Sequence, residues 1–434
     1  MRRFAIVLLA LPTIAAFAQQ DQQNSQPPPE QNAPGPNILT SLAQTFFHGD
    51  FVNFHAGISG LYDSNQAVLN SGIPGSFGFS LSGGVQAYHR FRESELSLSY
   101  NAAYSHYQGG GYLSGTNQNL GLLYSTRLSP RWNLGFVESA GEYRYGIGYY
   151  GQPYAPTPAL ANPFSPVTRF LLSGVSLSYR QTARLTYTLG GDFHLARYSY
   201  PGAIGNTGVS GSASVEYRLT GRTTVGGTYA HSYYTYQQGA GNATLDGGYF
   251  NISHQFAQYW TATASGGVTR SDSAGIIRIP VSVILNGQTI TGYEVGPYKL
   301  TKMTPSVQGS VSRRLRRTVA TVSAGQSVSP GNGVYLASTN RFISGSVSYS
   351  MRRANISAGG GWFHLTSLAN TIATGYSTGS FGASYSYTLT RYIAANARYE
   401  YFRYGNISSS GGVGDNRISF GVTFTSKGIP MTLY

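Results

Sequence analysis

The sequence predicts an all-β fold: a transmembrane antiparallel up-and-down β-barrel of about 18 strands, with 16 possible. Short turns are expected at one end of the barrel and longer loops at the other. Three observations predict this fold. An arginine-bearing turn recurs along the chain, and the segments between turns alternate apolar with small polar residues. Beyond residue 18, no run of about 18 apolar residues could form a helical membrane span.

The N-terminal residues have the three parts of an export signal: a basic start, a short apolar run and small residues before Gln19. The following segment is rich in Gln and Pro and has little to bury, which is typical of disorder. The predicted organisation is a signal peptide over 1–18, a disordered periplasmic lead-in over 19–49 and the barrel over 50–434. The chain has no cysteine, which excludes a lipid anchor on cysteine, disulfides and thiolate metal sites.

The repeated turn sets the number of strands. Clear copies are Leu128-Ser129-Pro130-Arg131, Leu219-Thr220-Gly221-Arg222, Met351-Arg352-Arg353 and Leu389-Thr390-Arg391. Others are centred near Phe91, Thr182, Ala257 and Leu315. Turns repeating at a near-fixed period indicate one repeated hairpin unit. Eight turns join sixteen strands. One strand before the first turn and one after the last, near Val52–Asp63 and Arg417–Thr425, bring the count to 18.

Each predicted strand has an apolar face and a small polar face. In the last strand, Ile418, Phe420, Val422 and Phe424 alternate with Ser419, Gly421, Thr423 and Thr425. A soluble sandwich would carry Lys and Glu on its polar face, whereas here that face is mostly Ser, Gly, Thr and Asn. Tyrosines precede several turns, where an aromatic girdle would meet the lipid–water boundary. The pattern therefore favours lipid outside and water inside.

On these features the chain resembles Gram-negative outer-membrane β-barrel proteins of the porin-like group, over Asp50 to Tyr434. The resemblance implies a place in the bacterial outer membrane, with short periplasmic turns, longer extracellular loops and both termini periplasmic. It also implies outer-membrane lipid and the barrel assembly machinery as partners. A homo-oligomer is possible, and neither a nucleic acid nor a cofactor is expected.

The formal net charge is +14, but the arginines gather in or beside the turns. We interpret those in the turns as contacts to lipid phosphates at the periplasmic rim. They are Arg131, Arg184, Arg222, Arg317, Arg353 and Arg391. A basic ring that attracts anionic solutes at the mouth is the alternative.

Candidate lumen residues follow from the polar parity of the strands. Asp192 and His194 share one polar face, and Arg398 and Glu400 share another. Glu138, Glu142 and Arg144 also share a parity, but Trp132, Leu134 and Phe136 have it too, so a β-bulge near Phe136 is expected. Such mixed charge either creates a transverse field at a constriction or stabilises the barrel wall.

Two outer loops are predicted to matter. Residues 146–168 carry five prolines with Tyr149, Tyr150 and Tyr154, and a stiff loop of this kind can fold into the mouth as a constriction. Residues 273–304 have apolar runs on both sides of Asn286-Gly287, which predicts a hairpin extending above the membrane.

The favoured function is a porin-like channel for passive or weakly selective passage of small hydrophilic solutes. The alternative is a barrel component of an exopolysaccharide export or surface-assembly system. An outer-membrane enzyme is less favoured, because the eight histidines are scattered and no catalytic or metal-ligating constellation stands out.

Overall fold

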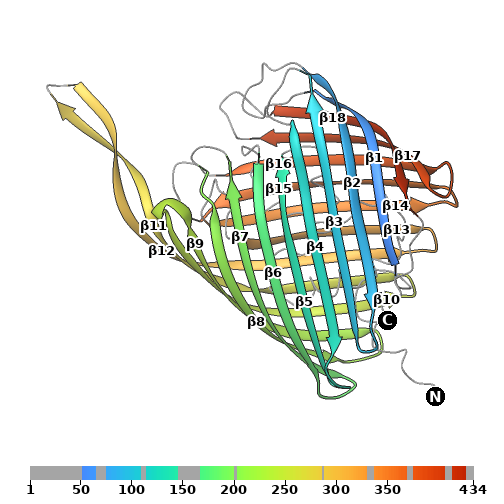
Figure 1. Cartoon of the computed structure of the whole chain (residues 1–434). Coiled ribbons are helices and arrows are strands. Elements are labelled where there is room, and N and C mark those ends of the chain that lie inside the picture. Colours follow the sequence, from blue (N-terminus) through green and yellow to red (C-terminus); the bar gives the residue numbers. More distant parts are fainter. Residues whose placement is uncertain are drawn as a thin grey trace.

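The computed structural model is a closed barrel of 18 antiparallel strands in the part of the chain that it describes (Figure 1). The described residues are 51–64, 75–108, 114–144, 167–199, 203–285, 288–329, 337–368, 375–405 and 413–426. Each strand pairs with its neighbours in the sequence, and β1 pairs with β18 from His55↔Thr425 to Asp63↔Arg417. Closure leaves no unpaired edge, which lipid would not tolerate. The predicted fold class and strand count are confirmed.

The first nine strands are β1 (Phe51–Asp63), β2 (Ser76–Arg90), β3 (Ser94–Tyr107), β4 (Gly115–Arg127), β5 (Trp132–Arg144), β6 (Val167–Arg180), β7 (Leu185–Tyr198), β8 (Asn206–Arg218) and β9 (Thr223–Tyr236). The others are β10 (Gly241–Ala257), β11 (Trp260–Leu285), β12 (Gln288–Arg314), β13 (Thr318–Ser329), β14 (Ser338–Ser350), β15 (Ala354–Ser367), β16 (Tyr376–Thr388), β17 (Ile393–Gly405) and β18 (Val413–Thr425). A 3-10 turn, η1 (Gln237–Gly239), joins β9 to β10. Among the described residues, no helix is long and apolar enough to cross a membrane.

The two faces of the wall differ as the alternation predicts. Large apolar side chains stand exposed on the outside; Phe420 is 65% exposed and Phe77 64%. The inner face carries small hydroxyls, many of which pair across neighbouring strands. Such pairs include Ser323 with Ser344, Ser357 with Ser384, Thr263 with Ser310 and Thr269 with Ser306, at 2.6–3.0 Å. The inner wall therefore combines hydroxyl groups, many of them already satisfied, with buried aromatic and apolar side chains such as Tyr143, Phe170 and Phe402.

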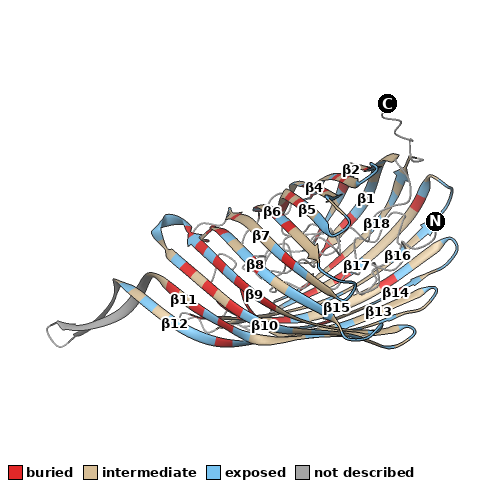
Figure 2. Cartoon of the chain, turned by 90° about the horizontal axis from the view of Figure 1, so that it is seen from below, coloured by how far each residue is buried: buried red, intermediate tan, exposed pale blue. Residues whose placement is uncertain are grey.

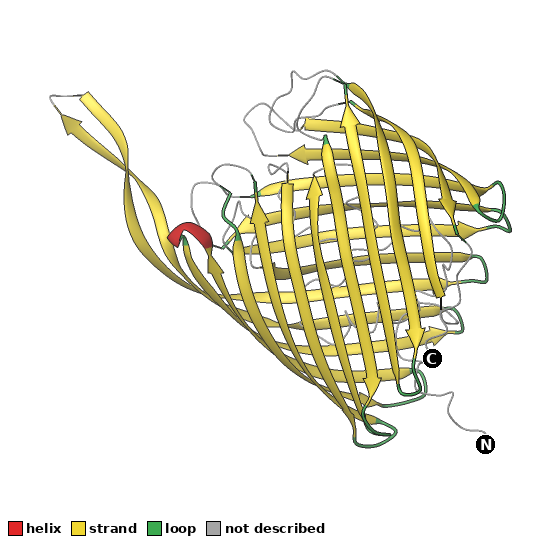
Figure 3. Ribbon diagram, viewed as in Figure 1, coloured by secondary structure: helices red, strands yellow, loops and turns green. Residues whose placement is uncertain are grey.

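All eight short turns lie at the same end of the barrel, here called the turn end; the opposite end is the loop end (Figure 3). One backbone carbonyl in each turn accepts a hydrogen bond from an amide near the end of the second strand after that turn. The turn between β2 and β3, for example, accepts from the end of β4. The acceptors are Glu93, Arg131, Arg184, Arg222, Tyr259, Arg317, Arg353 and Tyr392, and the donors are Arg127, Arg180, Arg218, Gln255, Arg314, Ser350, Thr388 and Thr425, at 2.7–2.9 Å. These bonds tie each hairpin to the next, so one local geometry repeats around the rim.

The Ser or Thr of the repeated motif explains the shape of the turn. The Ser129 hydroxyl accepts hydrogen bonds from the amides of Arg131 and Trp132, both at 3.2 Å. Thr182 accepts from the corresponding two amides at 3.0–3.1 Å, and Thr390 does so at 3.2 Å. A hydroxyl two residues upstream thus satisfies amides that the tight reversal leaves without a strand partner.

β11 and β12, of 26 and 27 residues, are about twice the length of most other strands and project from the loop end as a hairpin (Figure 1). Their pairing runs without a break from Trp260↔Arg313 to Leu285↔Gln288. β10 pairs with β11 only as far as Gly275, and β12 pairs with β13 only from Val307. The hairpin expected around Asn286-Gly287 is confirmed, although those two residues lie outside the described ranges.

Candidate functional site

The lumen is the candidate site, and its inward side chains differ in burial between the two ends. On β9 the inward residues from Thr228 to Tyr236 are buried, whereas Thr224 and Gly226, nearer the turn end, are partly accessible. On β10, Ala243 and Leu245 are buried, whereas the inward residues after Gly247 are partly accessible. Figure 2 shows the same concentration of buried positions on these strands toward the projecting hairpin. The loop-end half of the lumen is therefore the more densely packed half.

A buried ion network lies at the loop end, where the barrel closes. Arg417 on β18 contacts Oδ2 of Asp63 on β1 at 2.9 Å and Oδ2 of Asp415 at 2.8 Å. Its guanidinium also lies 4.9 Å from the ring centre of Phe402 on β17. The three charged side chains are 0–3% exposed. Ion pairs held this far from water are strong locally, because little solvent screens them.

Two predicted lumen residues form an ion pair beside this network. Arg398 and Glu400 face inward on β17 and pair with each other, with side chains 12% and 6% exposed. Glu400 is also the cross-strand partner of Arg417. The sequence pointed to the β17 pair, but the β1 and β18 members of the network were missed. The parity that places Ile418 and Phe420 outside would have placed Asp415 and Arg417 inside, had it been extended two residues further.

Asp192 and His194 lie on the inner face of β7, as predicted, but they do not pair with each other among the described contacts. The Ser210 hydroxyl donates to Asp192 at 3.3 Å. His194 Nε2 lies 2.7 Å from Oδ1 of Asn206, and its ring centre lies 5.0 Å from that of Tyr234. The neighbours come from β8 and β9, so these polar groups are held by the wall itself.

The predicted lumen position of Glu138, Glu142 and Arg144 is wrong. Pairing of β5 with β6 is continuous from Trp132↔Tyr179 to Arg144↔Val167, so the expected bulge near Phe136 does not form. Without a bulge, the three residues share the outer face with Trp132 and Phe136, which are 39% and 37% exposed. Val137, Ser139 and Tyr143 take the inner face instead and are buried. Glu142 pairs outside the barrel with Arg169, at 2.7 Å.

Two groups of arginines stand out at the turn end. The six predicted rim residues all lie in the turns and are exposed, and their contact with lipid phosphates stays a prediction: Arg131, Arg184, Arg222, Arg317, Arg353 and Arg391. Each arginine of the second group is the last residue of its strand and occupies a position that faces the lumen: Arg90, Arg127, Arg180, Arg218 and Arg314. Arg180 lies within electrostatic reach of Arg127 and Arg218. The sequence alone did not separate these two groups.

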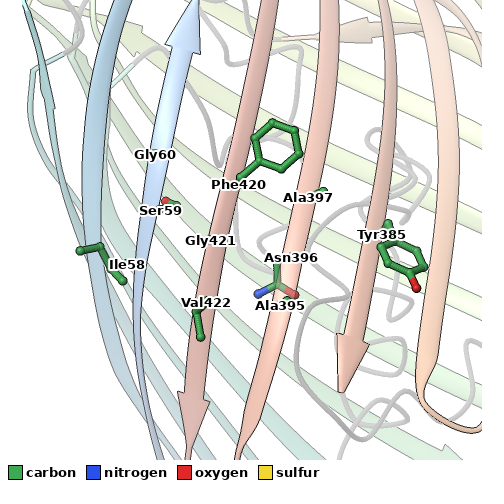
Figure 4. A pocket seen from close by; sticks show the side chains of 10 residues that line it. All are labelled: Ile58, Ser59, Gly60, Tyr385, Ala395, Asn396, Ala397, Phe420, Gly421 and Val422. Carbon is green, nitrogen blue, oxygen red and sulfur yellow. The ribbon is translucent and has the colours of Figure 1, made fainter. Parts of the chain in front are cut away.

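A groove of about 520 Å³ opens on the outer wall rather than in the lumen. It crosses β1, β16, β17 and β18, and in Figure 4 the rings of Phe420 and Tyr385 stand on either side of Ala397. Its floor is low because Gly60, Ala395 and Ala397 carry little or no side chain. It is a depression in the apolar outer surface and no part of the lumen.

Tyr149, Tyr150 and Tyr154, with the rest of residues 145–166, lie outside the described residues, so the proline-rich constriction stays a prediction. The predicted signal peptide and lead-in lie outside them too. Within the described ranges, no group of three or more His, Asp or Glu side chains is arranged to hold a metal ion.

No protein-family model and no curated protein sequence matches this chain. Solved barrel structures do match it. The crystal structure of Pseudomonas aeruginosa OccK2 (OpdF) is 14% identical, with a TM-score of 0.45, over 87% of this chain and 99% of that one. A BenF-like porin from Pseudomonas fluorescens Pf-5 is 12% identical, with a TM-score of 0.44, over 87% and 99%. Acinetobacter baumannii OccAB3 is 9% identical, with a TM-score of 0.41, over 86% and 99%. The likeness concerns the fold alone.

Proposed function

We propose that the protein is a porin-like outer-membrane channel through which small hydrophilic solutes pass passively or with weak selectivity. One observation carries the proposal: a closed ring of 18 strands whose outer face is apolar and whose inner face carries many Ser, Thr and Asn side chains and all of the buried charged ones. A barrel of 16–18 strands is wide enough to hold an aqueous lumen. In this arrangement the turn end and both termini face the periplasm, and the loop end faces the cell exterior.

The densely packed loop-end half is the proposed constriction. Its charged members are the network around Arg417, the neighbouring pair of Arg398 and Glu400, and further along the wall Asp192 and His194. The exposed turn arginines are proposed to contact lipid phosphates, since arginine binds phosphate through two parallel hydrogen bonds.

The inward arginines at the turn end make the channel prefer ions of one charge sign. Arg127, Arg180 and Arg218 end alternate strands, so they form an arc along one side of the mouth. Arg90 is partly offset by Glu95, at 3.5 Å. A cationic mouth raises the local concentration of anions. The expected channel is therefore weakly anion-selective.

Purified protein in planar bilayers tests both parts of the proposal. Stepwise conductance is expected, with a reversal potential in a potassium chloride gradient that favours chloride. Replacing Arg127, Arg180 and Arg218 with Gln should move that potential toward cations. The matched control replaces the turn residues Arg131, Arg184 and Arg222, and it should leave the potential unchanged. A folded barrel that never conducts would overturn the channel assignment, and equal effects of both triple variants would overturn the role of the arc.

A further inference from the structure

Glu138 is a carboxylate on the apolar outer wall, near the middle of β5. It lies six residues from Trp132, the first residue of the strand at the turn end. Six residues of strand span about 20 Å. With a strand tilt of about 40°, this is about 15 Å of depth, within an apolar band about 25 Å tall. Glu138 therefore lies well inside the hydrocarbon layer.

Among the outward carboxylates of the described strands, Glu138 is the one without a basic partner. The described strands carry three other outward carboxylates, and each has a basic partner: Glu142 with Arg169 at 2.7 Å, Asp246 with His231 at 2.7 Å and Asp272 with Arg270 at 2.9 Å. No hydrogen bond or ion pair of Glu138 is found in the described part of the chain. Ionisable groups facing lipid are unfavourable unless a partner covers them.

The surroundings of Glu138 specify what could cover it. Its cross-strand partners are Leu122 on β4 and Ser173 on β6. Ser173 places an outward hydroxyl directly across from Glu138 and, like Glu138, has no hydrogen bond among the described contacts. Around these two lie outward apolar residues: Leu120 is 40%, Phe136 37% and Val175 47% exposed. A hydrogen-bond acceptor and a donor thus stand side by side within an apolar field.

A donor–acceptor pair of this kind is complementary to itself when rotated by 180°. With a two-fold axis between β5 and β6, parallel to the membrane normal, the carboxylate of one copy faces the hydroxyl of the other, and the reverse holds at the same time. No basic side chain lies beside Glu138 on β4 or β6 at this depth to offer a salt bridge within one copy. Within one copy Glu138 and Ser173 are cross-strand neighbours without a hydrogen bond between them, and a second copy brings the same hydroxyl to face the carboxylate from the opposite side.

We propose that the outer faces of β4, β5 and β6 form the contact between two copies of this chain, with Glu138 of each copy accepting a hydrogen bond from Ser173 of the other. The surrounding leucine, phenylalanine and valine side chains seal the contact against lipid. Burial of a hydrogen-bonded carboxylate between two walls replaces its unfavourable exposure to hydrocarbon.

The absence of native cysteine makes the contact directly testable. Two chains with different tags, one carrying Glu138→Cys and the other Ser173→Cys, are produced together and oxidised in native outer membranes. A mixed disulfide between the two tags is expected. The matched control is Val322→Cys on β13, which is 57% exposed on the opposite side of the ring and should not cross-link to either. Absence of the mixed disulfide in folded barrels, or equal yield from Val322→Cys, would overturn the proposal.

A second measurement does not depend on disulfide chemistry. Glu138→Leu removes the acceptor, suits lipid better and should still fold, yet it should weaken dimerisation in detergent about tenfold or more, as the loss of a charged hydrogen bond implies. Glu138→Gln keeps an acceptor oxygen and should retain most of the dimer. Undiminished dimerisation of Glu138→Leu would count against the contact. Because each barrel has its own lumen, conductance of the Glu138→Leu monomer is expected to persist, so this test is independent of the channel assignment.

Discussion

Replacing Arg417 with Met should destabilise the barrel more than any single change at the rim. Arg417 is the cation that holds Asp63 and Asp415 together at the junction of β1 and β18. Methionine keeps much of the volume and the contact with Phe402, but leaves the two carboxylates with no positive charge between them. The variant therefore isolates the electrostatic role of the guanidinium from its packing role.

The size of the effect follows from the geometry. At 2.8–2.9 Å and an effective dielectric constant of about 20, each pair is worth about 6 kcal/mol before desolvation is subtracted. Desolvation opposes this by several kcal/mol per ion, and the side chains of Arg417, Asp63 and Asp415 are 0–3% exposed. Removing one partner of such a buried pair costs about 3–5 kcal/mol, because the remaining charge stays buried.

Urea unfolding in detergent micelles, followed by the shift of the heat-modifiable band, measures this loss. The control is Arg353→Met, which removes an exposed turn arginine and should change stability by less than about 1 kcal/mol. Adding Asp63→Asn to Arg417→Met should restore part of the loss, and acid should narrow the gap because protonated carboxyls carry no charge. A loss below about 1 kcal/mol for Arg417→Met at neutral pH would refute the reasoning.

Three further predictions test other parts of the wall. Thr220→Ala should cost about 1 kcal/mol in urea unfolding, because its hydroxyl accepts from the amide of Arg222 at 3.1 Å, whereas Thr220→Ser should cost little. Gly208→Val should cost about 1–3 kcal/mol, since a Cβ there would lie 2.3 Å from Tyr234 and 2.5 Å from His194; Gly211→Val, with nothing closer than 4.0 Å, is the control. Joining Gly275 to its register partner Tyr298 through a two-residue turn should leave a heat-modifiable barrel, because β10–β11 pairing stops at Gly275 and β12–β13 pairing starts at Val307; failure to fold would show that the projecting hairpin is needed for assembly.

The turns and the strand count could be predicted because both depend on local chemistry. Thr220 and Thr390 accept hydrogen bonds from amides two residues downstream, so a short sequence is sufficient to specify the reversal. Two-residue alternation then fixes which residues share a face. These rules need no knowledge of distant partners, and they were enough to give an 18-strand barrel with a long hairpin around Asn286-Gly287.

The ion network could not be predicted to the same extent, because it depends on which strands close the ring. Asp63 and Arg417 are more than 350 residues apart, and they meet because β1 pairs with β18. Parity assigns each of them a face but not a partner. Arg398 and Glu400 were found because they lie two residues apart on the same strand, so a local pattern was sufficient to pair them.

On β5 the alternation of inward and outward residues holds throughout, and the exception expected at Phe136 does not occur. Glu138, Glu142 and Arg144 have the parity of Trp132 and Phe136, and a bulge was expected because charge on the lipid face is unfavourable. The strand stays regular, so the unfavourable exposure of these charges to lipid has to be relieved by partner groups. For Glu142 the partner is Arg169 of the same copy, with which it forms an ion pair. Glu138 has no such partner among the described contacts. The conflict between alternation and charge at that position is resolved if the outer face around Glu138 contacts a second copy of the chain instead of lipid.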